Sequence, residues 1–471
     1  MTLYREDHLR FLFITAKVGV SNPNRVEMPP KNSPPFFLCQ VLVILRKQIK
    51  YEEHQKALCS RVPTHAAIKR GRNGLKRILY ISGSIGLGHV GRDLAIAGAL
   101  RELRPDIEIS WMAESPASDV LEKAGEKLLP ETNLLHKAND VLEETAKEYE
   151  ANLVQWAMNM RKGWAKNCEV YAKVFESYNF DLLIGDETYD ILIAMVNDPN
   201  FKKLPFVVVY DILGLDASTW NPVDHIATYV TNRLWVKFLK STPPLAEKSI
   251  FVGELEDVVD KSFGFMLPNR RKLAEKVCDF VGYILPEDIE NFKDKTKTRQ
   301  LLGYGDESLV ICSIGGTSAG RSLLDLCVAA YPLVRKKISN LQMVLVCGPR
   351  VSPESVKAPE GVKVLGYVPN LYRHLGAADL CIVSAGGTIT LELTALQKPF
   401  LYFPLEQHFE QEVGVASVCQ RHRAGVRMTR SKTSPETLAE AILSNLGRPV
   451  DYPKIPINGA NEAAKVIAGL L

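Results

Sequence analysis

Short apolar runs alternate with longer stretches in which apolar residues recur at helical spacing, beginning at Lys76. The first run, residues 77–84, leads into a glycine-rich loop and then into residues 91–103, where the spacing predicts a helix. Further elements are predicted in the same stretch: strands at 107–115, 181–187 and 205–211, a helix at 117–126, and helix-rich sequence over 133–178. Because strands that alternate with helices form parallel sheets, this part of the chain is predicted to be an α/β domain.

The second half of the chain repeats this pattern. Its predicted strands are 279–285, 309–317, 341–348, 362–368, 380–387 and 400–405, with helical patterns between them and one more amphipathic helix in the last 20 residues. We place the boundary in charge-rich sequence, which gives an N-terminal domain of 75–265 and a C-terminal domain of 266–471. The predicted fold class is therefore α/β, with two Rossmann-like domains that face each other across a cleft.

Residues 1–74 keep neither period for long, because prolines interrupt their apolar clusters. We predict a poorly ordered extension, with a membrane or partner tether as the functional alternative.

The distribution of charge limits the choice of partners. The net charge is +4, but residues 1–76 hold 14 basic and 5 acidic side chains, whereas the other 395 residues hold 44 and 49. The folded part therefore lacks the basic bias of a dedicated nucleic-acid binder, and no nucleic-acid partner is predicted.

The apolar runs are short for a membrane protein. The longest candidate, residues 36–45, has about half of the ~20 residues that a membrane-spanning helix needs, so we expect a soluble, cytoplasmic protein. The nine cysteines include no C-x-x-C pair, and several lie inside apolar runs. They are expected to be buried thiols in a reducing compartment.

Gly83, Gly86 and Gly88 precede His89 between the first predicted strand and helix. Glycines let the backbone approach a ligand, and the start of the helix offers free N–H groups to an anion. One interpretation is a dinucleotide site in which Glu114, at the end of the next strand, binds the ribose. Another is a catalytic site in which the positive helix end keeps His89 neutral as a general base. A histidine that only caps the helix is the structural alternative.

A second glycine loop contains Gly315, Gly316 and Thr317, again between a strand and a helix. Its amides and hydroxyls suit a phosphate, although no G-K-[ST] follows as in a Walker loop. A tight turn that only lets the strand and helix pack is the alternative.

A third motif occupies residues 384–416. Its glycines open a helix that suits a diphosphate, a glutamate further along can accept hydrogen bonds from a ribose diol, and an acid–amide pair suits sugar hydroxyls. The residues concerned are Gly386, Gly387, Thr388, Glu392, Glu410 and Gln411.

The order G-G-x-x-T-L-E, K-P-x-x-x-x-P and E-Q resembles the donor-site signature of GT-B glycosyltransferases over residues 75–471. The resemblance is to the peptidoglycan N-acetylglucosaminyltransferase (MurG-like) group and, more distantly, to UDP-glucuronosyl and plant UDP-sugar transferases. Ser384 and Ala385 replace the histidine that opens the motif in the last two groups. The resemblance implies transfer of a hexosyl or N-acetylhexosaminyl unit from a nucleoside diphosphate sugar, with uridine as the expected base, to an acceptor hydroxyl.

The resemblance also implies a set of donor contacts. The second loop and the Gly386–Gly387–Thr388 loop would hold the diphosphate, and Glu392 the ribose. The backbone of Val368 would hold the base, and Gln411, with Glu410 beside it, the transferred sugar. The loop that carries Gly86 and Gly88 would belong to the acceptor side.

For the chemistry we expect His89 to be the base, with inversion at the anomeric carbon. Asp186 or Asp211, at the ends of two strands, would orient it or act in its place. The chain contains no D-x-D sequence to hold a divalent ion, so we expect a reaction that needs no metal and no cofactor. Three alternatives remain: a sugar-nucleotide 2-epimerase, a dinucleotide-dependent oxidoreductase, and a non-catalytic sugar-nucleotide-binding subunit.

The acceptor is left open between a lipid, a glycan and a small molecule. Aromatic residues on the acceptor side either line its site or pack in the core; they are Trp156, Trp164, Trp220 and Trp235. Residues 232–240 mix basic and apolar side chains, which is compatible with peripheral contact at the inner face of an anionic membrane.

Overall fold

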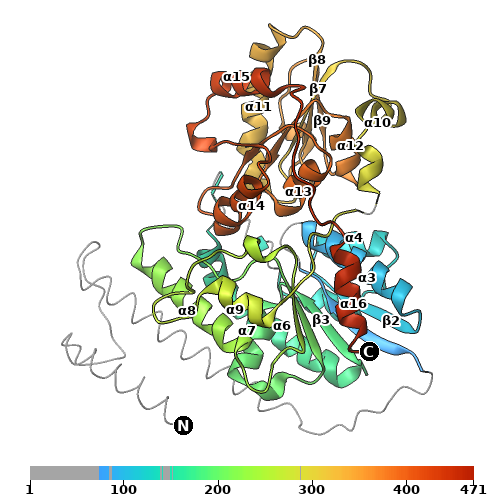
Figure 1. Ribbon diagram of the computed structural model, residues 1–471, viewed down its shortest axis with the longest axis vertical. Helices are drawn as coiled ribbons and strands as arrows, with labels where there is room; N and C mark the ends of the chain where they lie inside the picture. Colours follow the sequence, from blue (N-terminus) through green and yellow to red (C-terminus); the bar gives the residue numbers. More distant parts are fainter. Residues whose placement is uncertain (1–73, 84–86, 138–139, 142–148, 151, 287) are drawn as a thin grey trace, which may run out of the picture.

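The computed structural model describes residues 74–83, 87–137, 140–141, 149–150, 152–286 and 288–471. They form two lobes, with the N-terminal lobe at the bottom of Figure 1 and the C-terminal lobe at the top. The predicted extension lies outside the described residues, except for Gly74.

The N-terminal lobe is built on a six-stranded parallel sheet in the order β2-β1-β3-β4-β5-β6. Its strands are β1 (Lys76–Ile81), β2 (Ile107–Met112), β3 (Leu182–Asp186), β4 (Phe206–Tyr210), β5 (Lys248–Phe251) and β6 (Asp279–Phe280). Every residue of β3 and β4 is buried, because helices cover both faces of the sheet. This explains why these strands appear in the sequence as unbroken apolar runs.

The C-terminal lobe contains a second six-stranded parallel sheet in the order β12-β11-β10-β7-β8-β9. Its strands are β7 (Ser308–Ser313), β8 (Leu341–Val346), β9 (Val362–Leu365), β10 (Leu380–Ser384), β11 (Phe400–Phe403) and β12 (Val426–Arg427). This is the strand order of a Rossmann fold, so the predicted fold class is confirmed. In each sheet the order reverses beside the first strand, and ligands of such sheets bind at that point, beyond the carboxyl ends of the strands.

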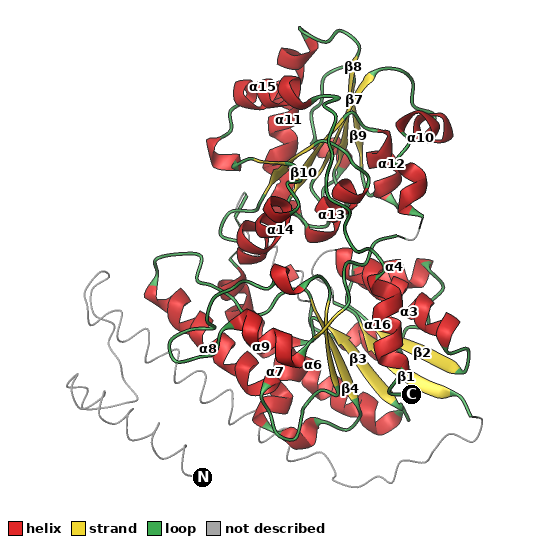
Figure 2. Cartoon of the chain, in the orientation of Figure 1, coloured by secondary structure: helices red, strands yellow, loops and turns green. Residues whose placement is uncertain are grey.

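Helices pack on both faces of each sheet (Figure 2). In the N-terminal lobe they are α3 (Gly88–Leu103), α4 (Ala117–Lys123), α6 (Leu153–Ser177), α7 (Tyr189–Asn197), α8 (Pro222–Leu239) and α9 (Arg270–Val277). In the C-terminal lobe they are α10 (Lys295–Leu302), α11 (Arg321–Arg335), α12 (Leu371–Ala377), α13 (Gly387–Ala395), α14 (Ala416–Arg421) and α15 (Pro435–Asn445). Local sequence sets their ends: α8 begins where the Asn221 side chain accepts a hydrogen bond from the Val223 amide, with Pro222 in the first turn.

The division of the chain between the lobes differs from the expected 265/266 boundary. Strand β6 belongs to the N-terminal sheet, and Leu273 of α9 lies in the core of that lobe. The last helix, α16 (Gly459–Ala468), returns from the C-terminal lobe and packs beside α3, as Figure 1 shows. Its apolar face, which includes Ala463 and Ile467, has its partner in the N-terminal lobe.

The predicted tryptophans occupy different places. Trp156 and Trp164 of α6 are buried in a cluster that also contains core residues of the C-terminal lobe, such as Phe403. Trp235 is buried in the N-terminal core, whereas Trp220 is 97% exposed. The packing interpretation therefore fits Trp156, Trp164 and Trp235. Trp156 and Trp164 also line a small cavity to which Gly83 of the first glycine loop contributes.

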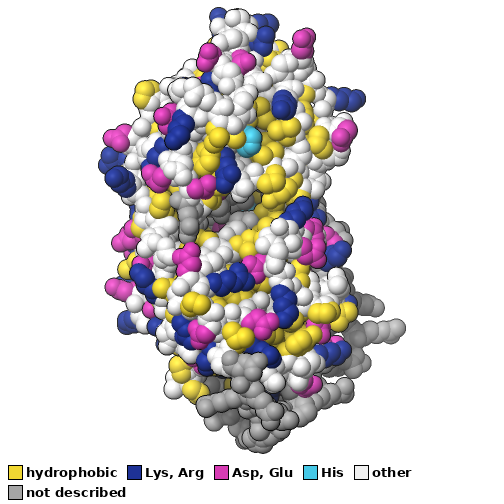
Figure 3. All heavy atoms as spheres, turned by 90° about the vertical axis from the view of Figure 1, so that its right-hand side faces the viewer, with side chains coloured by type: hydrophobic (Ala, Val, Ile, Leu, Met, Phe, Trp, Pro, Cys, Tyr) yellow, Lys and Arg dark blue, Asp and Glu magenta, His cyan; other side chains and the backbone are white. Residues whose placement is uncertain are grey.

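Hydrogen bonds join the lobes beside this cluster. The Tyr149 hydroxyl donates to the Phe403 carbonyl oxygen at 2.8 Å, and the Glu406 amide donates to the Tyr149 carbonyl oxygen at 2.9 Å. On the face shown in Figure 3, hydrophobic side chains continue from the upper lobe down to the junction. The two lobes therefore pack against each other through both polar and apolar contacts.

Candidate active site

His89 lies in the first turn of α3, at the switch point of the N-terminal sheet. Its Nδ1 is 3.2 Å from Asp186 Oδ2, at the end of β3, and its Nε2 is 3.4 Å from Glu187 Oε1. Asp211, which follows β4, is 3.8 Å from the same Nε2. The structure therefore brings together His89 and both carboxylates that the sequence proposed as its partners. Gly88 is next to it, whereas Gly86 lies outside the described residues.

Arg92, one turn further along α3, binds both aspartates. Its Nε donates to Asp186 Oδ2 at 2.9 Å and a terminal nitrogen donates to Asp186 Oδ1 at 2.5 Å, while the other donates to Asp211 Oδ2 at 2.8 Å. Sequence reasoning missed this residue. The signal was its position three residues after His89, which places both side chains on the same helix face.

The charges around His89 differ from the neutral imidazole that we expected. Burial and Arg92 would both lower the pKa of His89, but Glu187 and Asp186 outweigh them and raise it to about 10. Burial would raise the pKa of Asp186, but Arg92 and His89 hold it well below its usual value. The carboxylates at the strand ends thus outweigh the positive end of α3, so the pKa of His89 is raised where we expected it to be lowered.

Glu187 is a second residue that the sequence analysis did not single out. Its backbone has φ 54°, in the left-handed region, and its side chain lies against Gly83, where an added Cβ would be 2.8 Å from Oε2. Among the described residues this buried Oε2 has no hydrogen-bond partner, and burial raises the pKa of the carboxyl to about 8. The glycine in the first loop is thus required for the position of a carboxyl group beside the base.

The two glycine loops of the C-terminal lobe lie side by side at the other switch point. Ser384, at the end of β10, donates its hydroxyl to the Ile314 carbonyl oxygen at 2.9 Å, which joins the loop before α13 to the loop after β7. Gly315 has φ 77°, a conformation that favours glycine. Within the described part of the chain no side chain caps the start of α13, so the N–H groups of its first turn and its positive dipole end are available to an anion.

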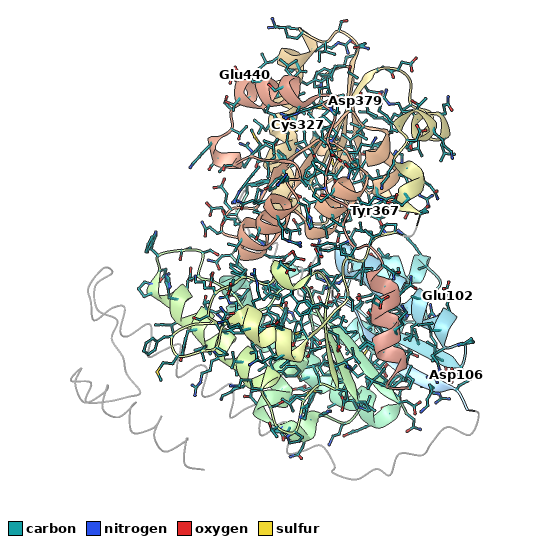
Figure 4. All side chains as sticks on the ribbon, viewed as in Figure 1. Glu102, Asp106, Cys327, Tyr367, Asp379 and Glu440 are labelled. Carbon is teal, nitrogen blue, oxygen red and sulfur yellow. The ribbon has the colours of Figure 1, made fainter. Side chains whose placement is uncertain are left out.

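Glu392 and Val368 flank these loops. Glu392 is on the second turn of α13, and within the described residues its carboxyl group has no hydrogen-bond or ion-pair partner; burial raises its pKa to about 8. Val368 follows β9 and packs at the edge of the C-terminal core. Its neighbour Tyr367, labelled in Figure 4, lies at the junction of the lobes with Lys123 Nζ 6.0 Å from its ring.

Glu410 and Gln411 begin a short π-helix, Glu410–Val415, and have different environments. Burial and Asp211 raise the pKa of Glu410 to about 7, although His89 lowers it. Glu410 therefore joins the acidic cluster of the N-terminal lobe from the C-terminal side. Gln411 Oε1 accepts a hydrogen bond from the Leu405 amide at 2.9 Å, which leaves its amide nitrogen to donate to a ligand.

The starts of α3 and α13 approach each other where the lobes meet. A Cβ at Gly88 would lie 2.5 Å from Thr388 Oγ1, so only glycine permits this distance. The catalytic group expected in one lobe and the diphosphate site expected in the other therefore face a shared space.

Neither a metal-binding cluster nor a membrane-spanning helix occurs among the described residues. No group of three or more His, Cys, Asp or Glu side chains among them has the arrangement of a metal site. No helix among them combines the length and hydrophobicity needed to cross a bilayer.

Known proteins resemble this chain in sequence or in fold. Residues 310–468 match the glycosyltransferase family 28 C-terminal domain. The chain is 30% identical, over 41% of its length, to an uncharacterized glycosyltransferase of Methanopyrus kandleri, and this match spans 54% of that relative. It is 22% identical, over 79% of its length, to the UDP-N-acetylglucosamine--N-acetylmuramyl-(pentapeptide) pyrophosphoryl-undecaprenol N-acetylglucosamine transferase of Clostridioides difficile, of which 82% is covered. The solved structure of the glycotransferase of kitacinnamycin has a TM-score of 0.53 at 16% identity, covering 84% of this chain and 99% of that one. The structural likeness concerns the fold.

Proposed function

We propose that this chain, which has the GT-B fold and is similar to MurG-like glycosyltransferases, transfers a hexosyl or N-acetylhexosaminyl unit from a UDP-sugar to an acceptor hydroxyl, with inversion and without a metal ion. The observation that carries this proposal is the position of the His89–Asp186 pair opposite two joined glycine loops. A base and an anion site face each other there, as displacement of a diphosphate requires.

The C-terminal lobe supplies the donor site. The N–H groups at Gly387 and Thr388 and the loop at Gly315–Thr317 bind the diphosphate, which leaves with additional negative charge. The unpartnered carboxyl of Glu392 accepts hydrogen bonds from the ribose hydroxyls. The backbone at Val368 contacts the base, and the free amide nitrogen of Gln411 donates to the sugar.

The N-terminal lobe supplies the proton acceptor. In its unprotonated form, which the raised pKa makes the minority form at neutral pH, His89 takes the proton of the acceptor hydroxyl. The oxygen bonds to the anomeric carbon, and the bond between that carbon and the diphosphate oxygen breaks. Asp186 orients the imidazole through Nδ1 and stabilises the imidazolium that forms. Arg92 is a positioning residue, since its contacts with Asp186 and Asp211 fix both carboxylates around the ring.

We also propose a cytoplasmic location with peripheral membrane contact, but through different residues from those expected. In the 232–240 stretch Trp235 and Phe238 are buried. The exposed apolar side chains of this lobe lie elsewhere: Phe265 is 81%, Met266 87% and Trp220 97% exposed. Flotation with phosphatidylglycerol vesicles tests this contact: the wild type should float and the triple alanine variant of these three exposed residues should not.

The test of the proposed function is release of nucleoside diphosphate from a panel of UDP-, GDP- and TDP-sugars. We expect UDP release that depends on an acceptor, persists in EDTA and is lost in His89→Ala. A new sugar nucleotide formed without acceptor would instead identify an epimerase. Binding of UDP-sugar without turnover under any condition would identify a binding subunit.

A further inference from the structure

The phenylalanine that precedes Glu410 crosses from one lobe to the other. Phe409 belongs to the segment after β11 of the C-terminal sheet, and the π-helix Glu410–Val415 begins directly after it. Its side chain is 5% exposed and packs in the buried apolar cluster of the N-terminal lobe, with Leu213 and Phe263. Within the described residues, the other buried members of that cluster all come from the N-terminal lobe. The N-terminal lobe therefore fixes one position of the C-terminal chain.

Arg270, the first residue of α9, lies between this ring and a ring of its own lobe. Its guanidinium carbon is 5.6 Å from the ring centroid of Phe409 and 5.7 Å from that of Phe263. The side chain is 1% exposed, and its Nε and Nη1 have no hydrogen-bond partners among the described residues. A cation at this distance from an aromatic face is attracted to the ring, and more strongly where water is excluded. Phe409 therefore helps to compensate for the burial of this charge.

The remaining nitrogen of Arg270 binds the segment after β4. Nη2 donates to the Leu215 carbonyl oxygen at 2.7 Å and to Asp216 Oδ1 at 2.6 Å. Gly214 leaves room for these contacts, since a Cβ there would be 2.9 Å from Arg270 Nε. The same segment begins with Asp211 of the acidic cluster around the proposed base. Arg270 thus connects the segment that carries one reacting group to the residue that precedes Glu410.

The two residues after Phe409 are those that we assign to the transferred sugar. Glu410 lines the space between the lobes together with Asp211, and Gln411 accepts a backbone hydrogen bond from Leu405. π-helices are rare and occur mostly as short turns at functional sites. Binding groups must be held within about 0.5 Å by residues that packing locks in place. Phe409 meets this condition, because its ring is buried in the core of the opposite lobe.

We propose that Arg270, through Phe409, positions Glu410 and Gln411 for the transferred sugar. This inference rests on the sugar contact proposed above. It makes Arg270 a positioning residue, which lies in the N-terminal lobe and acts on a donor contact of the C-terminal lobe. Loss of the contact between the guanidinium and the ring should weaken the binding of the sugar, while the sites for the diphosphate and the ribose remain as they are.

Calorimetric affinities for UDP and for the tightest-binding UDP-sugar of the panel above test this role, because their ratio isolates the contribution of the sugar. In Phe409→Leu and in Arg270→Met we expect this ratio to fall about 2- to 10-fold, the effect of losing one hydrogen bond, and kcat to fall with it. The affinity for UDP should stay at the wild-type value. Arg270→Met leaves no unpaired buried charge, since Asp216 keeps its ion pair with Lys261 at 3.0 Å.

Two further variants separate positioning from a general loss of structure. Arg270→Lys keeps a cation beside the two rings and should retain more of the ratio than the methionine variant. In the double variant Phe409→Leu/Gln411→Ala the ratio should be no lower than in Gln411→Ala alone, because both changes act through the same contact with the sugar.

Arg271→Met is the matched control on α9, since Arg271 donates to the Val258 and Glu256 carbonyl oxygens within its own lobe. Its ratio should equal that of the wild type. An unchanged ratio in folded Arg270→Met and Phe409→Leu, an equal loss of affinity for UDP and UDP-sugar, or additive effects in the double variant would overturn the positioning role while leaving glycosyl transfer intact. No UDP release by wild-type protein that binds the UDP-sugar more tightly than UDP would instead overturn the proposed function, with the sugar contact still supported.

Discussion

The two sides of the cleft differ in how completely their polar groups are paired. On the N-terminal side, Glu187 Oε2 lacks a partner among the described residues, but the guanidinium of Arg92 and the carboxylate of Asp186 are buried and bonded to each other. Asp93 behind them accepts hydrogen bonds from Tyr80 and Ser82. On the C-terminal side, Glu392 has no partner among the described residues and the first turn of α13 has no side-chain cap. The first arrangement holds reacting groups in place before a ligand arrives, whereas the second leaves groups free to bind one.

This comparison predicts that the N-terminal cluster contributes to folding as well as to catalysis. Arg92→Ala would leave Asp186 buried without its main counter-charge, so the free energy of unfolding should fall by about 3–5 kcal/mol. Chemical denaturation at neutral pH measures this change. Arg104→Ala is the control, because its pair with Asp106 is screened by solvent and its loss should change the stability little. Equal losses in the two variants would show that the cluster is not the more tightly held region.

The positioning role of Arg92 has its own measurement. Arg92→Lys keeps the charge but cannot bind Asp186 through two nitrogens while reaching Asp211. We expect it to recover much of the stability that the alanine variant loses while kcat remains lowered and KM for the donor stays near the wild-type value. Full recovery of kcat by lysine would mean that only the charge matters.

His89 separates catalysis from binding. His89→Ala should lower turnover by about 100-fold or more, because the acceptor proton loses its base, while donor affinity stays near normal since the donor contacts lie in the other lobe. Steady-state rates and UDP calorimetry on the same preparation measure both quantities. Unchanged turnover would remove His89 from the mechanism, and lost UDP affinity would contradict the division of roles between the lobes.

The sequence was sufficient for the features that depend on local pattern. Buried strands such as β3 and β4 appear as unbroken apolar runs, and the glycine loops lie where strand changes to helix. Strand β5 was not predicted, because it has only four residues and begins with a lysine. The return of α16 to the N-terminal lobe was also out of reach, because an amphipathic face does not specify its partner.

For the candidate site, too, contacts that depend on the three-dimensional structure could not be predicted from the sequence. The sequence placed Asp186 at the end of a strand and His89 at the start of the helix that follows another strand, and the structure brings the two side chains within 3.2 Å. The protonation of His89 depends on Glu187, whose carboxyl reaches the ring only because of a left-handed backbone beside Gly83. Charge balance in a buried cluster is set by three-dimensional distances, which a linear motif does not contain.

On the C-terminal side of the cleft, substitution of Glu392 should lower the affinity for UDP, whereas substitution of Arg92 should lower stability and turnover. Glu392→Ala should weaken UDP binding by about 1–3 kcal/mol through loss of a hydrogen-bond acceptor, as measured by calorimetry. Unaltered affinity would contradict the ribose assignment. Glu406→Ala is a suitable control, because Glu406 lies in the loop after β11 and its carboxylate accepts only a backbone hydrogen bond from Ser431.

The stability of the Glu392 variants should depend on pH. Burial raises the pKa of Glu392 to about 8, above its ordinary value of 4.5, so the folded state holds a proton that the unfolded state releases. The stability linked to this proton is fully present below about pH 4.5 and is lost as the pH rises to 8. Glu392→Gln should therefore unfold at higher denaturant concentration than the wild type at pH 8, with a smaller difference at pH 5. A buried carboxyl group that serves ligand binding, such as that of Glu392, therefore lowers the free energy of unfolding of the protein alone.

The smallest effect is expected from Glu187, and it tests how the cluster sets the proton affinity of the base. Removing the charge in Glu187→Gln takes away a carboxylate that raises the pKa of His89, so that pKa should fall. Since kcat/KM rises with pH as His89 loses its proton, the acidic limb of the profile should move to lower pH by about one unit. Glu108→Gln, which removes a surface carboxylate paired with Lys127, should leave the limb unchanged. A limb that stays fixed in Glu187→Gln but moves in Asp186→Asn would assign control of the base to Asp186 alone. Loss of turnover in Glu187→Gln would instead show that Glu187, not His89, accepts the proton.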